Sequence, residues 1–402
     1  MYQQIRSKVS FGLLAAALLA APCVAQAYTY KLIHVFTNSG GDGATPMGTP
    51  LLGQDGNIYG TTEFGGAYGF GTVYRVTPNG DVSYFYNFRG GDYGDGCAPK
   101  GGLMQDSQGN FYGTTLVCGS EGNVYGAGTV FRIAPDGTET VLHSFYYYEW
   151  DNKDGGGPYG PPILDSRGNL FGTTANGGHH VCRIVGIYCG TIYRIDRAGQ
   201  LHLIHQFNGR QGLAFPMAGL IFGEDGYMYG TTPFYSGRYY GTVYKTDMKG
   251  HVTIVYGFHN PKTGANPEGG LVEDSLGNFY GDTNTGGTDD MGVIYKVSED
   301  GTETVLHNLT WDEGAHPRWG TLAMDAQGNL YGTTYDGGPS LGGVVFKLAP
   351  DGTYTILHAF DCDTGPCSPV GGVALDASGN IFGTTFLGDV ENQYGVIFEL
   401  AK

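Results

Sequence analysis

The sequence has few charged residues, and the basic ones are the scarcer. Charged side chains make up 15% of the 402 residues, and 21 Lys and Arg against 38 Asp and Glu give a formal net charge of −17. Disordered chains usually carry a larger share of charge, so we expect a folded protein. An acidic surface repels phosphate backbones, and we therefore expect no nucleic-acid partner.

Long apolar segments are missing after the N-terminal region, so we expect no transmembrane segment in the rest of the chain. Near the N-terminus, Arg6 and Lys8 precede an apolar run over residues 11–21, and Ala25-Gln26-Ala27 matches a small-x-small cleavage pattern. These features predict a signal peptide and export to the periplasm or the cell exterior. A lipoprotein signal at Cys23 is the weaker alternative, because a proline directly precedes that cysteine.

The motifs of common catalytic and cofactor-binding folds are missing as well. The sequence has no nucleophile elbow, zinc-ligand spacing, phosphate-binding loop or dinucleotide fingerprint. We therefore expect no cofactor and no metal site.

Glycine, in contrast, is abundant, and much of it belongs to an internal repeat. A phrase built on Tyr-Gly-Thr-Thr occurs seven times, with its glycine at Gly60, Gly113, Gly172, Gly230, Gly281, Gly332 and Gly383. The steps between successive glycines are 53, 59, 58, 51, 51 and 51 residues. This period is typical of repeat architectures with one four-stranded unit per copy.

Each copy contains four stretches of strand character, which we call strands a to d. In the sixth copy they are Thr321–Met324, Asn329–Thr334, Gly343–Leu348 and Tyr354–Phe360. Gly-containing turns such as Pro350-Asp351-Gly352 separate them, as expected for tight hairpins.

The two ends of the chain indicate a closed ring. The seventh copy stops at strand c, Gly395–Leu400, and a strand-d sequence stands instead before the first copy, at Tyr30–Phe36. An open solenoid has no use for that displaced strand, whereas a ring needs it to pair the last sheet edge. We predict a signal peptide over residues 1–27, followed over 28–402 by one all-β domain. This domain is a seven-bladed β-propeller of four-stranded antiparallel blades, and its N-terminal strand completes blade 7.

Three motifs recur in fixed order in the seven copies: a Gly-Asn-x-Tyr-Gly-Thr-Thr core, a Gly-Thr-Val-Phe strand and a Leu-His-x-Phe strand. Together they resemble the GloVer tandem repeat of exported bacterial proteins, and the resemblance covers essentially the whole chain after the signal peptide. It implies an extracellular or periplasmic propeller and transfers no activity.

In a propeller, the a-to-b and c-to-d turns lie on one face, here called the turn face, and the b-to-c and d-to-a loops lie on the other, the loop face. Six cysteines follow the signal peptide, an even number that favours disulfides in an exported chain. All six belong to the loop face. The simplest pairing is Cys97 with Cys118, Cys182 with Cys189, and Cys362 with Cys367, and fourteen other connectivities stay open.

Elongated loops of blades 2 and 3 also belong to the loop face. The b-to-c loops have 12 residues (Leu116–Ala127) and 15 residues (Ala175–Cys189), and the connection between the blades runs over Tyr146–Gly160. Aromatic rings beside polar groups suit sugar rings, whose apolar faces stack. The ligand-binding candidates are Tyr147, Glu149, Trp150, His179, His180, Trp311 and Trp319. The alternative is that the loops only shield blade edges and that the tryptophans belong to the core.

Two departures from the repeat are expected near the axis. Asp282 replaces the first Thr of the motif in blade 5, and His316 and Arg318 precede strand a of blade 6. A base with Arg beside a uronic-acid carboxylate would suit a polysaccharide lyase, because Arg neutralises the carboxylate before proton abstraction. The alternative is a buried Asp and a surface His-Arg pair without catalysis.

Two hypotheses follow, and the sequence leaves open whether the protein is an enzyme. The first is an exported non-catalytic propeller that binds a glycan or a cell-surface protein through its loop face. The second is a polysaccharide-degrading enzyme, a uronic-acid lyase, with its site at the channel mouth. The sequence does not indicate the oligomeric state.

Overall fold

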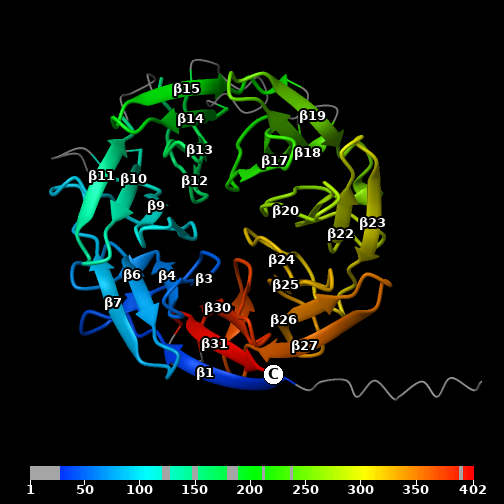
Figure 1. Cartoon of the computed structure of the whole chain (residues 1–402). Helices are drawn as coiled ribbons and strands as arrows, with labels where there is room; N and C mark the ends of the chain where they lie inside the picture. Colours follow the sequence, from blue (N-terminus) through cyan, green and yellow to red (C-terminus); the bar gives the residue numbers. More distant parts are fainter. Residues whose placement is uncertain are drawn as a thin grey trace, which may run out of the picture.

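The computed structural model describes residues 28–119, 127–146, 153–178, 189–210, 213–235, 239–388 and 393–402. These residues form seven antiparallel sheets arranged as blades around a central axis (Figure 1). The predicted seven-bladed β-propeller is therefore confirmed. No helix of the described residues is long and apolar enough to cross a membrane.

Each blade has the same strand order from the axis outwards. Strands a are β3 (Leu51–Leu52), β8 (Met104–Gln105), β12 (Ile163–Leu164), β16 (Ile221–Phe222), β20 (Val272–Glu273), β24 (Ala323–Met324) and β29 (Ala374–Leu375). Strands b are β4 (Ile58–Thr62), β9 (Phe111–Thr115), β13 (Leu170–Thr174), β17 (Met228–Tyr235), β21 (Phe279–Thr283), β25 (Leu330–Thr334) and β30 (Ile381–Leu387). Strands c are β6 (Thr72–Val76), β10 (Thr129–Ile133), β14 (Thr191–Ile195), β18 (Tyr240–Thr246), β22 (Val293–Val297), β26 (Leu341–Leu348) and β31 (Val396–Ala401). Strands d are β7 (Val82–Asn87), β11 (Glu139–Ser144), β15 (Leu201–Gln206), β19 (Val252–Gly257), β23 (Glu303–Asn308), β27 (Tyr354–Asp361) and β1 (Thr29–Val35).

The ring closes through β1, as the displaced strand predicts. It pairs antiparallel with β31, from Thr29 opposite Ala401 to Val35 opposite Val396. Figure 1 shows the blue N-terminal strand lying beside the red C-terminal one. Blade 7 thus joins both ends of the described chain.

Some strands are shorter than expected, and some elements are additional to the four strands of each blade. Strands a are only two residues long, because Gly- and Pro-rich segments precede them. On the loop face, β2 (Gly43–Ala44) pairs with β5 (Phe64–Gly65), and β28 (Cys367–Pro369) adds a fifth strand to blade 7 by pairing with β30. A short 3-10 helix, η2 (Pro261–Thr263), lies between blades 4 and 5.

The hydrophobic core lies between the blades. Each apolar cluster of the described residues combines side chains from two neighbouring blades. In the cluster that joins blade 7 to blade 1, Phe36 and Ile397 pack with Ile58 and Tyr74. A blade therefore buries its apolar surface only against its neighbours, and this favours the closed ring.

Candidate functional site

The segments that lead into strands a meet around the axis on the loop face. A β-carbon added to Gly101 would collide with the carbonyl of Tyr159, and one added to Gly160 would collide with the backbone of Gly219. Glycine is required at these positions because neighbouring chains approach closely there. In five of the blades, the residue just before this glycine, or before Ala218 in blade 4, lines the space around the axis.

These residues surround a cavity of about 230 Å³ at the axis. Its lining includes Met47, Lys100, Tyr159, Met217 and Trp319, which come from five different blades. We call this the axial cavity. Trp319 is 37% exposed and so presents part of its ring to solvent.

The ammonium group that lines the axial cavity is held in place. Lys100 Nζ lies 3.1 Å from Glu63 Oε1 and 5.9 Å from the ring centroid of Tyr159. The ion pair joins the blade 1 loop to the segment before blade 2. It orients a positively charged donor beside an aromatic face.

Four of the predicted site residues gather in blade 6. The guanidinium of Arg318 lies 4.3 Å from the ring centroid of Tyr335 and 5.9 Å from that of Trp319. His316 Nδ1 is 2.8 Å from Asp336 Oδ1, and its ring centroid is 6.4 Å from that of Trp311. Trp311 is 41% exposed. This cluster adjoins the axial cavity through Trp319.

Asp282 is buried, in contrast to Trp311 and Trp319 of this cluster. It is 6% exposed, and it shares with Arg318 a crevice between blades 5, 6 and 7 that is too narrow to hold a water molecule. Burial, and then the negative charge of Glu268, raises the pKa of Asp282 to about 7. His316 does not line the crevice. The three lyase candidates therefore do not share a space that a substrate could enter.

The repeat explains what Asp282 faces. In five other blades the first Thr of the motif donates a hydrogen bond to a backbone carbonyl of the next blade: Thr61 to Gly101, Thr114 to Gly160, Thr173 to Ala218, Thr231 to Gly269 and Thr333 to Gly371. By the repeat, the corresponding acceptor for Asp282 is the carbonyl of Gly320. A protonated carboxyl can donate to it, whereas a carboxylate cannot.

Two of the predicted disulfides are present on the loop face. Cys97 is bonded to Cys118 with a Cα–Cα distance of 5.3 Å, and Cys362 to Cys367 with one of 5.0 Å. Cys189 is also disulfide-bonded. Its predicted partner Cys182 lies outside the described residues, as do the ligand candidates Tyr147, Glu149, Trp150, His179 and His180.

An aromatic patch on the loop face of blade 1 was not predicted. It consists of Phe64, Phe70, Tyr93 and Tyr394, which are between 38% and 60% exposed. Contacts between their segments bring these residues to one region. The carbonyl of Tyr394 accepts a hydrogen bond from Thr45, whose neighbour Ala44 pairs with Phe64. Gly65 bridges to Phe70, the ring of Phe70 lies against Gly90, and the N–H of Tyr93 donates to the carbonyl of Gly90. The guanidinium of Arg89 is 4.8 Å from the ring centroid of Tyr93. Phe64 and Phe70 stand in the b-to-c loop of blade 1, Tyr93 in the d-to-a loop after β7 and Tyr394 in the b-to-c loop of blade 7, so no single stretch of sequence indicated the patch.

No metal centre is apparent in the part of the chain that the structure describes. Its His, Cys, Asp and Glu side chains form no group of three or more that could hold a metal ion. The described loop face combines aromatic rings and the ion pair of Lys100 with Glu63. It also holds Glu268 Oε2 and Arg318 Nε, which are buried without a hydrogen-bond partner among the described residues.

Comparisons with known proteins agree with this architecture. The model of the Gloeobacter/Verrucomicrobia repeat matches residues 23–233 and 216–402. A luciferin-regenerating enzyme is 12% identical with a TM-score of 0.47, over 93% of this chain and 95% of that one. A mutant of puromycin hydrolase is 12% identical with a TM-score of 0.54, over 87% of this chain and 50% of that one. The likeness to puromycin hydrolase, at 12% identity, concerns the fold alone. No curated protein has a significantly similar sequence.

Proposed function

The chain belongs to the Gloeobacter/Verrucomicrobia repeat family, and we propose that it is an exported propeller that binds glycans, without catalysis, through its loop face. The axial cavity carries this proposal. It combines the ring of Tyr159, the partly exposed ring of Trp319 and the tethered ammonium of Lys100. Sugar rings stack their apolar faces on such aromatics while their hydroxyls bond to polar groups at the edge.

The surroundings of the cavity support a binding surface larger than one sugar unit. The blade 6 cluster adds the exposed ring of Trp311, and the aromatic patch of blade 1 adds Phe64, Phe70 and Tyr93. Aromatic groups at the axis and away from it suit an extended chain better than a small metabolite.

Export is part of the proposal. The disulfides Cys97–Cys118 and Cys362–Cys367 suit an oxidising compartment, the periplasm or the cell exterior. A signal peptide over residues 1–27 would deliver the remaining chain there. A cell-surface protein is the alternative partner for the same face.

The geometry favours binding over the lyase alternative. A lyase needs a base and a carboxylate-binding Arg around one substrate position. Asp282 and Arg318 share only a packed crevice, and His316 is hydrogen-bonded to Asp336. Lyase activity would require these groups to rearrange.

The test is a glycan array probed with the wild-type protein and with Trp319→Ala. We expect binding to at least one class of glycan, weakened about 5- to 150-fold in the variant, because a stacked ring contributes about 1 to 3 kcal/mol. Tyr227→Ala is the matched control, since Tyr227 is an aromatic residue of the turn face and is 39% exposed. An array without any bound glycan, or equal losses in both variants, would count against the proposal.

A further inference from the structure

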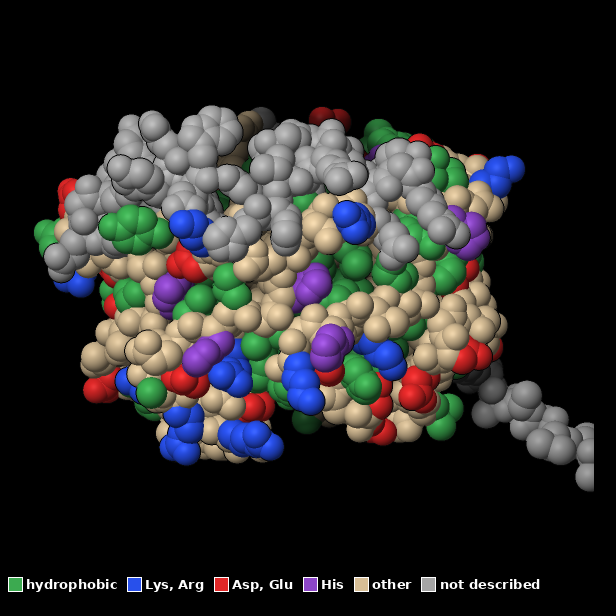
Figure 2. Space-filling view, turned by 90° about the horizontal axis from the view of Figure 1, so that it is seen from above, with side chains coloured by type: hydrophobic (Ala, Val, Ile, Leu, Met, Phe, Trp, Pro, Cys, Tyr) green, Lys and Arg blue, Asp and Glu red, His purple; other side chains and the backbone are tan. Residues whose placement is uncertain are grey.

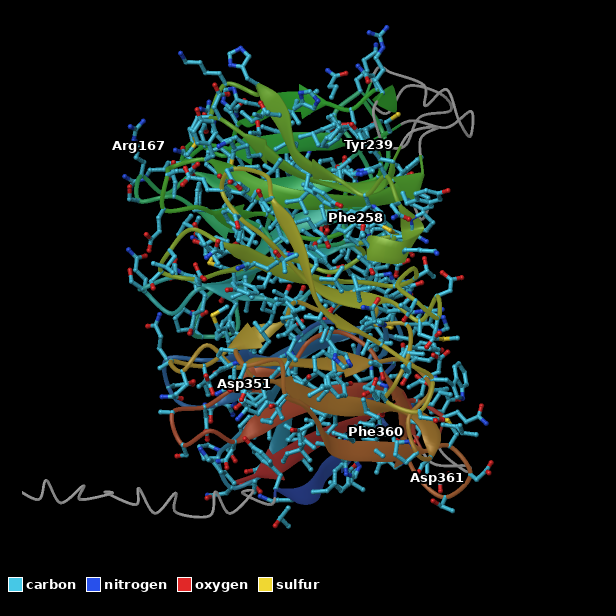
Figure 3. The ribbon with its side chains drawn as sticks, turned by 90° about the vertical axis from the view of Figure 1, so that its right-hand side faces the viewer. Arg167, Tyr239, Phe258, Asp351, Phe360 and Asp361 are labelled. Carbon is cyan, nitrogen blue, oxygen red and sulfur yellow. A yellow bond between two sulfur atoms is a disulfide. The ribbon has the colours of Figure 1, made fainter. Side chains whose placement is uncertain are left out.

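A groove on the turn face between blades 2 and 3 differs from the rest of that face. It has a volume of about 670 Å³, an aliphatic floor that includes Leu142 and Leu164, and three arginines, Arg132, Arg167 and Arg197. We call it the arginine groove. In Figure 3, Arg167 projects from the side opposite to Tyr239 and Asp361, which belong to the loop face. The groove is therefore remote from the axial cavity.

The neighbouring groove between blades 1 and 2 serves as an internal comparison. It measures about 430 Å³ and is lined by Phe85, Gln108 and Pro135. By the repeat, these positions correspond to Leu142, Arg167 and Arg197 of the arginine groove. Folding alone requires the same turn at both places, so the wider space and the two added guanidinium groups need another explanation.

The arginines of the groove form no close ion pair with the described residues, although the charge of Arg167 acts on the carboxylate of Asp165. None of Arg132, Arg167 and Arg197 forms an ion pair with a described residue. Nε of Arg132 is moreover buried without a hydrogen-bond partner among the described residues. A buried donor without a partner is costly, and a bound acceptor would remove that cost.

The carboxylates of the groove are already engaged. Asp106 accepts hydrogen bonds from the side chains of Asn110 and Tyr112, and Asp165 accepts hydrogen bonds from the backbone N–H and the side chain of Asn169. The third carboxylate is that of Asp196, which is bonded to His202 and to backbone N–H groups of its own turn. The three aspartates and the three arginines give the groove a formal charge of zero, in a chain whose net charge is −17. Among the described residues, none of these carboxylates forms an ion pair with a guanidinium group of the groove.

Charged side chains of both signs lie together on the turn face. Figure 2 looks at the outer rim of the ring, and Lys or Arg side chains lie beside Asp and Glu along its lower edge, which is the turn face. A local site for a negative group is therefore compatible with an acidic protein, because its own cations face it at short range.

We propose that the arginine groove binds an oxyanion, a carboxylate, sulfate or phosphate group. Guanidinium groups present paired N–H donors that match two oxygens of such a group. The aliphatic floor would contact the apolar body of a ligand that carries the oxyanion. The source is either a free inorganic ion or an anionic polysaccharide.

The test is calorimetric titration of the protein with inorganic phosphate, inorganic sulfate and dextran sulfate, with neutral dextran as the blank. We expect at least one anion to bind the wild type, and the triple variant Arg132→Gln, Arg167→Gln, Arg197→Gln to bind it at least about tenfold more weakly. Binding of the inorganic ions alone would identify a free ion as the ligand, whereas binding of dextran sulfate alone would identify a polymer.

The matched control is Arg75→Gln, which changes an arginine of the groove between blades 1 and 2. It should bind the anion like the wild type. The double variant Arg167→Gln, Arg197→Gln alters only exposed turn residues, and it keeps the test valid if loss of Arg132 prevents folding. Absence of anion binding by the wild type, or equal binding by wild type and variants, would overturn the proposal.

Discussion

One aspartate in each a-to-b turn explains why Asn and Tyr recur further along the repeat. Asp106 accepts hydrogen bonds from the side chains of Asn110 and Tyr112 and from the backbone N–H of Gln108. Burial works to raise the pKa of Asp106, but these hydrogen bonds outweigh it and the pKa is lowered. The motif thus encodes a polar network that holds strand b to its turn.

Asp282 stands where the other described blades have a Thr, and in five of them this Thr donates a hydrogen bond to the next blade. We expect Asp282→Thr to restore a neutral donor toward the carbonyl of Gly320. The pKa of Asp282 is raised by burial to about 7 in the folded state, so the folded protein holds that proton more tightly than the unfolded chain. The contribution of Asp282 to stability should therefore be fully present below about pH 4 and be lost as the pH rises to about 7.

The measurement is urea unfolding at pH 5 and pH 8. Asp282→Thr should be more stable than the wild type at pH 8 by about 1 to 3 kcal/mol, with a smaller gain at pH 5. Glu268, Arg318 and Tyr295 also face Asp282, and they are unchanged in the variant. Asp363→Thr, in an exposed turn, is the control. The same difference at both pH values would contradict this assignment.

Single-residue departures from a repeat can be predicted from sequence only where the motif is long. Asp282 stands out because it replaces Thr in a phrase that is otherwise intact. Lys100 and Tyr159 were missed because they stand in short Gly- and Pro-rich segments whose path to the axis only the fold defines. Arg167 and Arg197 were missed for a related reason. They replace other residues in repeated turns, and the backbone of the turn is the same with either side chain.

Among the elements, the outer strands d share a feature that the sequence pattern did not predict. Each c-to-d pairing has a shift of register that leaves one strand-d residue unpaired. In blade 1 this residue is Phe85, which packs against Phe111 of blade 2 with ring centroids 5.5 Å apart. The bulge therefore directs an apolar side chain into the next blade and disrupts an edge that could pair with another chain.

In blades 4 and 5 the glycine of the c-to-d turn lies against the bulge of the preceding blade. A β-carbon on Gly301 would lie 2.6 Å from the carbonyl oxygen of Val255, the bulged residue of the preceding blade, and Gly301 has φ +85°. Glycine adopts this positive φ without strain, and its missing side chain leaves room for the carbonyl oxygen. Strand positions followed from alternation and turn residues, but contacts between blades depend on tertiary packing that periodicity does not encode.

Strand β1 is the element on which closure depends. Deleting residues 28–36 removes the partner of β31 and takes Ile33 and Phe36 out of the cluster between blades 7 and 1. We expect aggregation, or a melting temperature lower by at least about 5 °C, because several kcal/mol of apolar burial are lost. The measurement is thermal melting by circular dichroism together with gel filtration.

The control for that deletion is Lys31→Ala, which removes the exposed ion pair between Lys31 and Glu399 but keeps the strand. Surface ion pairs contribute little, so its melting temperature should stay within about 2 °C of the wild type. A deletion variant that melts like the wild type would show that the ring does not need β1.

Across the whole molecule, the closed ring separates two faces with different chemistry. The loop face has the axial cavity, the exposed rings of Trp311 and Trp319 and both described disulfides. The turn face repeats short hydrogen-bonded turns and departs from them at the arginine groove. The sequence predicted the ring and the face of unequal loops, because both follow from counting repeats. It could not predict which side chains meet at the axis.

Hydrogen–deuterium exchange with a saturating amount of an array-selected glycan tests most directly whether the loop face is the binding face. We predict that protection appears in the segments around the axial cavity, residues 98–102, 158–161 and 316–321, and that exchange in turn-face segments 106–109 and 197–199 is unchanged. Protection confined to the turn-face segments, with no change around the axial cavity, would contradict it.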